Sequence, residues 1–194
     1  FDHGLQYVSP KSNKFKNFIL DLKKKKIVKE WPGNHLDFTF KKKENFKKYI
    51  GMEGNNHICK YLIKNIKSNF LSTITNISFN SNYWTITSNK NDKFYFKKLI
   101  LTCPFPQLIK MSSKYLSKKV LKLKPQMLAN ITIMVVYKNS KQVPINTIKF
   151  NDKILAWASQ ENTKNRFKSD QTLWTIQCTE KFSNKIINLF KRNK

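Results

Sequence analysis

The segment with the clearest potential for chemistry is a glycine loop between a predicted strand and a predicted helix. Gly51 and Gly54, two of the four glycines in the chain, lie three residues apart within residues 49–62. Glycine allows positive φ angles and lets a ligand or another backbone come close. Asn55 or Asn56 can cap the first turn of the following helix, and such a helix N-terminus can receive a phosphate or a carboxylate. The pattern fits either an anion-binding loop or an ordinary turn into a helix.

Side chains suited to acid–base or metal chemistry are few, because the chain has 11 acidic residues and three histidines. His3, His35 and His57 lack the spacing of metal ligands, so we interpret them as structural or surface residues. Asp2 and Glu30 are expected at strand ends or in polar core positions, without a catalytic role. No phosphate-binding loop, HExxH helix or nucleophile motif is present. The sequence therefore assigns no catalytic residue and no metal.

The tryptophans lie on segments with strand character. Burial in a core explains most such residues, and the alternative is that some of them line an apolar pocket for a planar ring. The four are Trp31, Trp84, Trp157 and Trp174.

These residues must be positioned by a mixture of helices and strands. Apolar side chains at helical spacing predict a helix over residues 15–22, a second helix behind the glycine loop, a short helix around residue 109 and a closing helix from residue 186. Alternating and β-branched runs bounded by turn residues predict strands. These cover residues 27–31, 36–40, 73–79, 83–87, 94–96, 127–137, 145–150, 154–159 and 173–178, with a fully buried strand at 99–102. Antiparallel strands with inserted helices indicate an α+β fold, with a mixed or antiparallel sheet.

The net charge of +27 is large, and a nucleic acid or an anionic membrane is the usual partner of such a chain. Only Arg166 and Arg192 are arginines, although arginine is the residue that grips phosphate bidentately. The lysines are spread along the chain beside abundant Asn and Ile, which favours AT-rich codon usage, and we expect no specific nucleic-acid partner. No apolar run is long enough to span a bilayer. Three cysteines without a CxxC pair indicate a reducing, cytoplasmic location.

Several motifs, in order, resemble those of renalase-like proteins, which are FAD-dependent oxidoreductases of the flavin amine oxidase superfamily. FDHGLQY at residues 1–7 resembles the family's FDHGAQYF segment, and the glycine loop resembles its YxGxPGM loop and helix. Asn162, Lys164 and Arg166 resemble an N-S-K-x-R pattern. Further matches are EWPG at 30–33, the LxLPxPQ-like segment at 99–107, LAWA at 155–158 and the W…S segment at 174–183.

The resemblance implies a two-domain flavoenzyme that transfers a hydride from a small reduced substrate, an amine or a dihydronicotinamide, to FAD. Residues 1–10 and 49–112 would face the dinucleotide-binding, NAD(P)-binding-like domain, and residues 11–48 and 113–194 would form mainly the substrate domain. The implied flavin-side residues are Gly4, Gln6 and Tyr7. The implied domain-interface and cofactor residues are Gly51, Met52, Gly54, Ile74 and Pro104, and Trp157 would wall the substrate pocket.

The sequence departs from the family pattern at several positions. Leu5 replaces a small alanine and could crowd the ring, Glu53 replaces a proline, and Phe182 replaces a tryptophan. The loop between Asn162 and Arg166 is one residue short. The family's G-x-G-x-x-G loop, which holds pyrophosphate, and its C-terminal GD segment are not in the sequence. We therefore expect the chain to be the central portion of a longer flavoprotein, and these 194 residues alone to bind FAD weakly and be inactive.

Two other functions remain open on the sequence. A lysine-rich nucleic-acid-binding module would show affinity that falls steeply with salt. An inactive relative of the flavoenzymes would fold correctly with an empty cofactor site.

Overall fold

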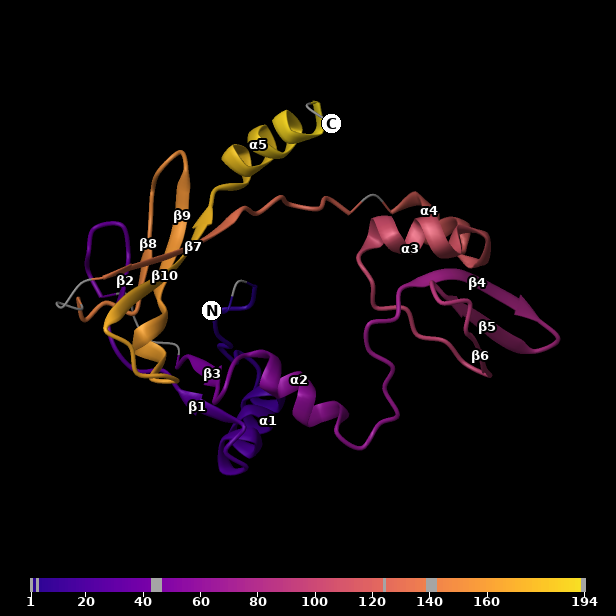
Figure 1. Cartoon of the computed structure of the whole chain (residues 1–194), viewed down its shortest axis with the longest axis horizontal. Coiled ribbons are helices and arrows are strands. Elements are labelled where there is room, and N and C mark those ends of the chain that lie inside the picture. The colour runs from indigo at the N-terminus through magenta and orange to yellow at the C-terminus, as the bar shows by residue number, and fades with distance from the viewer. Residues whose placement is uncertain (1, 3, 43–46, 124, 139–142, 193–194) are drawn as a thin grey trace. The chain divides into compact units, whose positions relative to one another are not determined.

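The computed structural model describes residues 2, 4–42, 47–123, 125–138 and 143–192. The sequence positions Phe1 and His3 lie outside the described residues. The chain divides into two compact units, a first unit of residues 1–66 and 128–194 and a second unit of residues 67–127 (Figure 1). Both combine helices with antiparallel strands, which agrees with the predicted α+β class.

The first unit contains a five-stranded sheet in the order β2-β8-β9-β10-β7 (Figure 1). All of its pairs are antiparallel except β2 with β8. In β10 the buried residues are Thr172, Thr175 and Cys178, whose spacing of three places buried side chains on both faces of this strand. The strands are β2 (His35–Leu36), β7 (Thr132–Lys138), β8 (Thr147–Lys149), β9 (Leu155–Gln160) and β10 (Gln171–Cys178).

A second layer of the first unit is built around helix α1 (Asn13–Lys24), which confirms the predicted amphipathic helix. Ser12 caps it by accepting a hydrogen bond from the Phe15 backbone N–H, and two lysines in its last turn suit the negative end of the helix dipole. The helix packs on the antiparallel pair β1 (Val28–Glu30) and β3 (Tyr49–Gly51), beside helix α2 (Asn56–Ile63). Their shared core is Ile19, Leu22, Ile27, Val28 and Tyr49.

The chain between β9 and β10 forms a short 3₁₀ helix, η2 (Glu161–Lys164). The Asn162 side chain holds η2 against β10, because it donates to the Gln171 carbonyl and accepts from the Leu173 N–H, both at 2.8 Å. Helix α5 (Glu180–Arg192) follows β10. The polar segment that the sequence indicated as a loop is therefore tied closely to the sheet.

The second unit confirms the three strands predicted over residues 73–96, which form an antiparallel meander of β4 (Ile74–Asn80), β5 (Tyr83–Ser88) and β6 (Lys93–Phe96). Ser81 and Asn82 join β4 to β5 with positive φ angles of 48° and 68°, as a tight hairpin requires. After the sheet come α3 (Phe105–Ser112), η1 (Ser113–Tyr115) and α4 (Lys118–Lys122).

Three predicted strands are wrong in whole or in part. Residues 99–102 form no strand, and Ile100 is 86% exposed, because this apolar run has no partner strand among the described residues. The strand predicted over 36–40 ends at Leu36, where the Asp37 carboxylate accepts from the backbone N–H groups of residues 39 and 41 and closes a turn. The long strand predicted from residue 127 begins only at Thr132.

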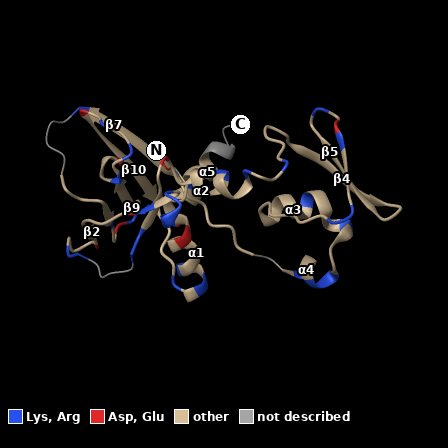
Figure 2. Ribbon diagram, turned by 90° about the horizontal axis from the view of Figure 1, so that it is seen from below, with Lys and Arg blue, Asp and Glu red and all other residues tan. Residues whose placement is uncertain are grey.

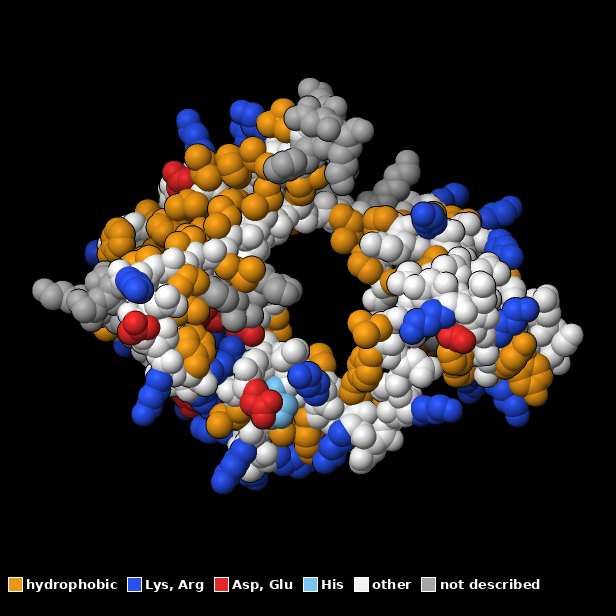
Figure 3. Space-filling view, in the orientation of Figure 1, with side chains coloured by type: hydrophobic (Ala, Val, Ile, Leu, Met, Phe, Trp, Pro, Cys, Tyr) orange, Lys and Arg blue, Asp and Glu red, His pale blue; other side chains and the backbone are white. Residues whose placement is uncertain are grey.

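Apolar side chains gather over the five-stranded sheet, in the region where Figure 1 labels β7, β9 and β10 (Figure 3). Strand β7 is an edge strand, and four of its large apolar side chains are exposed: Ile133, Met134, Val136 and Tyr137. This sheet therefore buries its apolar surface less completely than the α1 core does. Among the described residues, none of the helices is both long and apolar enough to cross a membrane.

Candidate functional site

Asp2 is the meeting point of three segments of the first unit that are distant in sequence. Its carboxylate accepts a hydrogen bond from Lys164 Nζ at 2.8 Å and pairs with the Arg166 guanidinium. It also accepts from the Asn55 backbone N–H and side-chain Nδ2, each at 3.1 Å. The N-terminal segment, the glycine loop and the η2 region are thus joined through one buried carboxylate.

Lys164 is fully buried at the centre of this network. Besides Asp2, its ammonium group lies 3.0 Å from Gln6 Oε1 and 3.0 Å from both carboxylate oxygens of Glu161. Its Nζ also lies 5.4 Å from the centre of the Trp31 ring. A buried ion costs several kcal/mol unless it is paired and hydrogen-bonded, and Lys164 satisfies both conditions.

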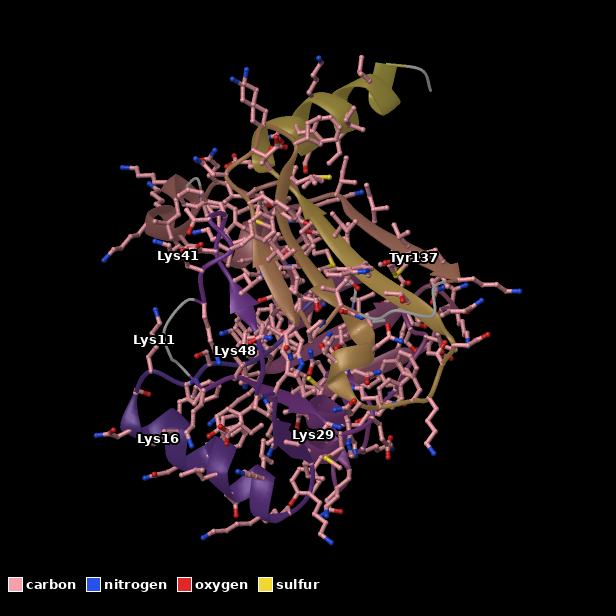
Figure 4. The ribbon with its side chains drawn as sticks, turned by 90° about the vertical axis from the view of Figure 1, so that its left-hand side faces the viewer. Lys11, Lys16, Lys29, Lys41, Lys48 and Tyr137 are labelled. Atoms are coloured by element: carbon pink, nitrogen blue, oxygen red, sulfur yellow. The ribbon has the colours of Figure 1, made fainter. Side chains whose placement is uncertain are left out.

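Arg166 fastens the glycine loop. Its Nε donates a hydrogen bond to the Gly51 carbonyl at 3.0 Å, and its Nη2 donates one to Asn55 Oδ1 at 3.1 Å. Its charge and that of Lys164 balance the carboxylates of Asp2 and Glu161, so the four groups are neutral together. Lys29 of β1, labelled in Figure 4, donates to the Asn165 carbonyl at 2.9 Å and ties the same segment to β1.

Asn55 differs from its predicted role. It occupies the N-cap position of α2, but its side chain makes no capping hydrogen bond. Its oxygen accepts from the Gly51 N–H at 2.9 Å, and its Nδ2 donates to the Leu5 carbonyl at 2.6 Å. The Asn55 amide therefore hydrogen-bonds to the N-terminal segment and Arg166, and these contacts replace the capping bond to α2.

The electrostatics of Asp2 follow from these contacts. Burial by itself would raise the pKa of Asp2, but hydrogen bonds from Lys164 and Arg166 outweigh it and hold the pKa below its usual value. Asp2 is therefore a fixed anion at neutral pH. Its role in this geometry is to hold other groups in place.

A cavity of about 560 Å³ opens beside the network. Its wall includes Gly4 and Gly54. Four charged residues also line it, and three of them are acidic, although basic residues outnumber acidic ones 38 to 11 in the chain. A Cβ atom added at Gly4 would meet nothing within 4 Å, so the backbone there faces open space. The lining residues are Asp2, Gly4, Leu5, Glu53, Gly54, Asn55, Asn56, Cys59, Glu161, Arg166 and Phe167.

An aromatic cluster adjoins the network. The Tyr7 ring neighbours both Trp31 and Trp157, with ring centres 6.2 and 6.4 Å away. Lys48, labelled in Figure 4, places its Nζ 5.4 Å from the centre of the Tyr7 ring. His35 packs edge-on against Trp31 at 4.9 Å. Tyr7 and Trp157 are only partly buried, so part of this cluster is accessible to a ligand.

Burial lowers the pKa of His35 to about 4, with nearby Lys48 and Lys42 acting in the same direction. Its Nε2 lies 3.1 Å from the Trp31 carbonyl, which only accepts, so Nε2 carries the proton. Nδ1 then accepts from the Thr147 hydroxyl at 3.0 Å. The neutral ring fixes Trp31 and is a structural histidine, as the sequence predicted.

The structure brings most of the predicted cofactor residues together. Gly4 and Gly54 line the cavity, Gln6 and Gly51 belong to the network, and Tyr7 joins Trp157 in the aromatic cluster. Met52 is partly exposed and does not line the cavity. Ile74 and Pro104 belong to the second unit, at the start of β4 and the N-cap of α3.

Sequence reasoning missed the charged network itself. The sequence patterns place Lys164 and Arg166 only within a motif and assign Asp2 and Glu161 no role at the site. One available signal was that acidic residues are scarce and that some of them stand beside apolar strands. A carboxylate that is buried beside such a strand needs a cationic partner. In the described part of the chain, no group of three or more His, Cys, Asp or Glu side chains could hold a metal ion.

Neither a protein-family model nor a curated protein matches the sequence. Among solved structures, a protein of Exiguobacterium sp. 255-15 assigned as a protoporphyrinogen oxidase has a TM-score of 0.53 at 13% identity, over 70% of this chain and 32% of that one. A putrescine oxidase mutant with redesigned cofactor binding has a TM-score of 0.51 at 13% identity, over 78% of this chain and 34% of that one. The chain thus spans about a third of each neighbour's length. At this identity the similarity shows the fold alone: this chain folds like part of two oxidases.

Proposed function

We propose that this chain forms part of the active site of an FAD-dependent oxidoreductase, renalase-like within the flavin amine oxidase superfamily. The observation that carries the proposal is that Gly4 and Gly54, implied as flavin-side and interface residues from separate motifs, line the same cavity. The oxidase fold of the two structural neighbours supports the same class of enzyme.

Two features of the described residues fit a planar, acceptor-rich group at this site. The open space at Gly4 allows a flat ring to approach the backbone, which any side chain there would obstruct. The Gln6 Nε2 atom is buried and has no hydrogen-bond partner among the described residues; its residue does not line the cavity but is bonded to Lys164, which also binds Asp2 of the cavity wall. Leu5 also lines the cavity, and its larger side chain narrows the space available to the ring.

In this proposal the chain holds and orients the cofactor while other groups position the substrate. FAD, when bound, supplies the electron chemistry by accepting a hydride from a reduced small molecule, an amine or a dihydronicotinamide. Gly4 and Gly54 of the cavity wall contact it, Gln6 is proposed as a further contact from the motif resemblance, and Asp2 and Arg166 hold together the segments that carry these residues. Tyr7 and Trp157 form an aromatic wall for the substrate.

The remaining parts of the proposal rest on the motif resemblance. These are the cofactor contacts of Met52, Ile74 and Pro104, and the assignment of residues 1–10 and 49–112 to the side facing the dinucleotide-binding domain. No residue is proposed as a proton donor or acceptor in the reaction.

The test is to purify the complete protein encoded by the gene and identify any bound flavin by its absorption spectrum and by chromatography after denaturation. Rapid anaerobic mixing with a panel of amines, NADH and NADPH should bleach the flavin absorbance with one class of substrate. A folded protein that neither retains nor binds added FAD would contradict the proposal and favour an inactive relative.

The nucleic-acid-binding alternative depends on the net charge of +27. Lys and Arg occur on helices, strands and loops of both units (Figure 2), and Lys11, Lys16 and Lys41 project into solvent from separate segments (Figure 4). Binding to duplex DNA measured at two salt concentrations distinguishes the cases. Tight binding at the lower salt concentration that weakens steeply at the higher one, with no flavin bound, would favour this alternative.

A further inference from the structure

Helix α1 and the residues that flank it carry a dense cluster of lysines. Residues 11–26 contain seven lysines in 16 positions, whereas Lys and Arg together make up 38 of the 194 residues of the chain. All seven are exposed, and Lys16 extends outward from the helix (Figure 4). This segment is therefore more than twice as rich in basic residues as the chain as a whole.

Ion pairs within the protein neutralise only part of this charge. Lys25 Nζ lies 2.7 Å from the Asp21 carboxylate, and Lys23 Nζ lies 3.4 Å from that of Glu30. With seven lysines and Asp21 as its one acid, the segment has a net charge of +6. Five of its lysines form no ion pair with any described residue: Lys11, Lys14, Lys16, Lys24 and Lys26.

Two phenylalanines of α1 are exposed beside these lysines. Phe15 and Phe18 have 41% and 36% of their surface exposed, and their nearly parallel rings lie 5.9 Å apart, centre to centre. The core under α1 is made by Ile19 and Leu22, so much of the phenylalanine surface is left to solvent. Lys14 is four residues before Phe18 and is therefore its neighbour on the helix surface.

Helix α2 adds to the same layer. Lys25 Nζ and Lys64 Nζ, from the ends of α1 and α2, lie 5.9 and 4.7 Å from the centre of the Tyr61 ring. Leu62 is four residues after Ile58, which packs against the α1 core, and it is still 47% exposed. The two helices thus combine unpaired lysines with exposed apolar side chains.

We propose that residues 11–26, together with the adjoining part of α2, bind the surface of a membrane that contains anionic phospholipids. The argument is charge complementarity: a segment with a charge of +6 is attracted to anionic headgroups, as amphipathic helices rich in lysine are. Phe15 and Phe18 would enter the boundary between headgroups and acyl chains, and the lysines would stay among the headgroups. The helix lies on the membrane in this proposal and does not cross it.

Two observations favour a membrane over a nucleic acid. The basic residues of this segment are all lysines, without the arginine that grips phosphate bidentately. Leu62 offers apolar surface but no ring on which a base could stack. The inference does not rest on the proposed function, since it concerns where the protein binds and not the reaction that it catalyses.

The experiment is co-sedimentation of the complete protein with vesicles of phosphatidylcholine, either pure or with about one-third phosphatidylserine. We expect at least about tenfold stronger binding to the anionic vesicles, because the neutral ones lack the attraction to lysine. Added NaCl should weaken this binding, since salt screens the charges.

Variants show whether this surface is responsible. Replacing Lys11, Lys14 and Lys16 by Gln should weaken binding to the anionic vesicles at least about tenfold. Replacing Lys118, Lys119 and Lys122 by Gln, which are exposed lysines of α4 in the second unit, removes the same charge and should change binding by less than about twofold. Phe18→Gln should weaken binding without any change of charge. Thermal unfolding verifies folding, and if Phe18→Gln does not fold, the lysine variants at exposed positions still provide the test.

Three results would overturn the inference. The first is equal binding of wild type to neutral and anionic vesicles, or no binding to either. The second is an equal loss of binding in the α1 and α4 lysine variants, which would assign the effect to the overall charge. The third is absence of vesicle binding together with binding to single-stranded RNA that the α1 variant loses, which would assign the surface to a nucleic acid. Flavin retention is measured separately, so failure of either proposal leaves the other intact.

Discussion

Lys164 Nζ lies 2.8 Å from Asp2 Oδ2, across 162 residues of sequence. Both side chains are almost completely buried, so the pair is shielded from water and salt. With Arg166, which binds the same carboxylate, it joins the N-terminal segment to the η2 region and the glycine loop. The network is therefore both a structural support of the first unit and the frame of its cavity.

Arg166 should not be replaceable by lysine. The guanidinium contacts the Gly51 carbonyl, Asp2 and Asn55 from three nitrogens, whereas a lysine has a single nitrogen. Arg166→Lys should lower the free energy of unfolding by about 2–3 kcal/mol, measured by urea denaturation. Lys16→Ala, at an exposed position of α1, serves as the control and should change it by less than about 0.5 kcal/mol. Equal midpoints for Arg166→Lys and wild type would show that the network does not support the fold.

Replacing each of two glycines by alanine should have different effects. A Cβ at Gly51 would lie 2.0 Å from the Gly54 carbonyl oxygen, whereas a Cβ at Gly4 would meet nothing within 4 Å. Gly51→Ala should cost about 1–3 kcal/mol or more, because backbone atoms must move. Gly4→Ala should keep the melting temperature of wild type and, under the proposed function, weaken FAD binding. Calorimetry and FAD titration measure the two effects, and a destabilised Gly4→Ala protein would contradict the open space assigned there.

His35 should make the protein less stable in mild acid. Its pKa is lowered from 6.5 to about 4 in the folded protein, so between these values the unfolded chain binds a proton that the folded one does not. Stability is therefore complete above pH 6.5 and falls as the pH is lowered, by at most about 3 kcal/mol once pH 4 is reached.

Urea denaturation from pH 7 to pH 4 measures this slope. His35→Gln, which cannot titrate, should lose most of it, although the substitution also lowers stability at neutral pH because the contacts with Trp31 and Thr147 change. A slope that is the same with and without His35 would assign the acid sensitivity to other groups.

Cys59 should report on occupation of the cavity. It is exposed and lines the cavity, whereas Cys178 is buried and its pKa is raised by that burial. A thiol reagent should modify Cys59 quickly and Cys178 only after unfolding, because the thiolate is the reactive form. Saturating FAD should slow modification of Cys59 in the complete protein, while Cys103 of the second unit serves as the internal reference. Equal rates at Cys59 with and without FAD would place the cofactor away from this cavity.

Local patterns in the sequence were sufficient for the elements that are stabilised locally. The apolar spacing of Ile19 and Leu22 predicts α1, and the turn residues Ser81 and Asn82 predict the hairpin of the second unit. Strand predictions were wrong where the strand depends on pairing with another segment. Residues 99–102 have strand composition but no partner strand among the described residues. Such a run satisfies its backbone groups in a sheet only if another segment lies beside it.

The candidate site divides in the same way. The sequence by itself determined which residues belong to the glycine loop and to the N-terminal motif, because glycine and amide residues there have distinctive spacing. Only the tertiary structure decided that Asp2 binds Lys164 and Arg166, and that Asn55 serves Gly51 and Leu5 instead of its own helix. The physical reason is that a buried charge or amide hydrogen-bonds to the group that the fold places within about 3 Å of it. The spacing of residues in the sequence does not predict that distance.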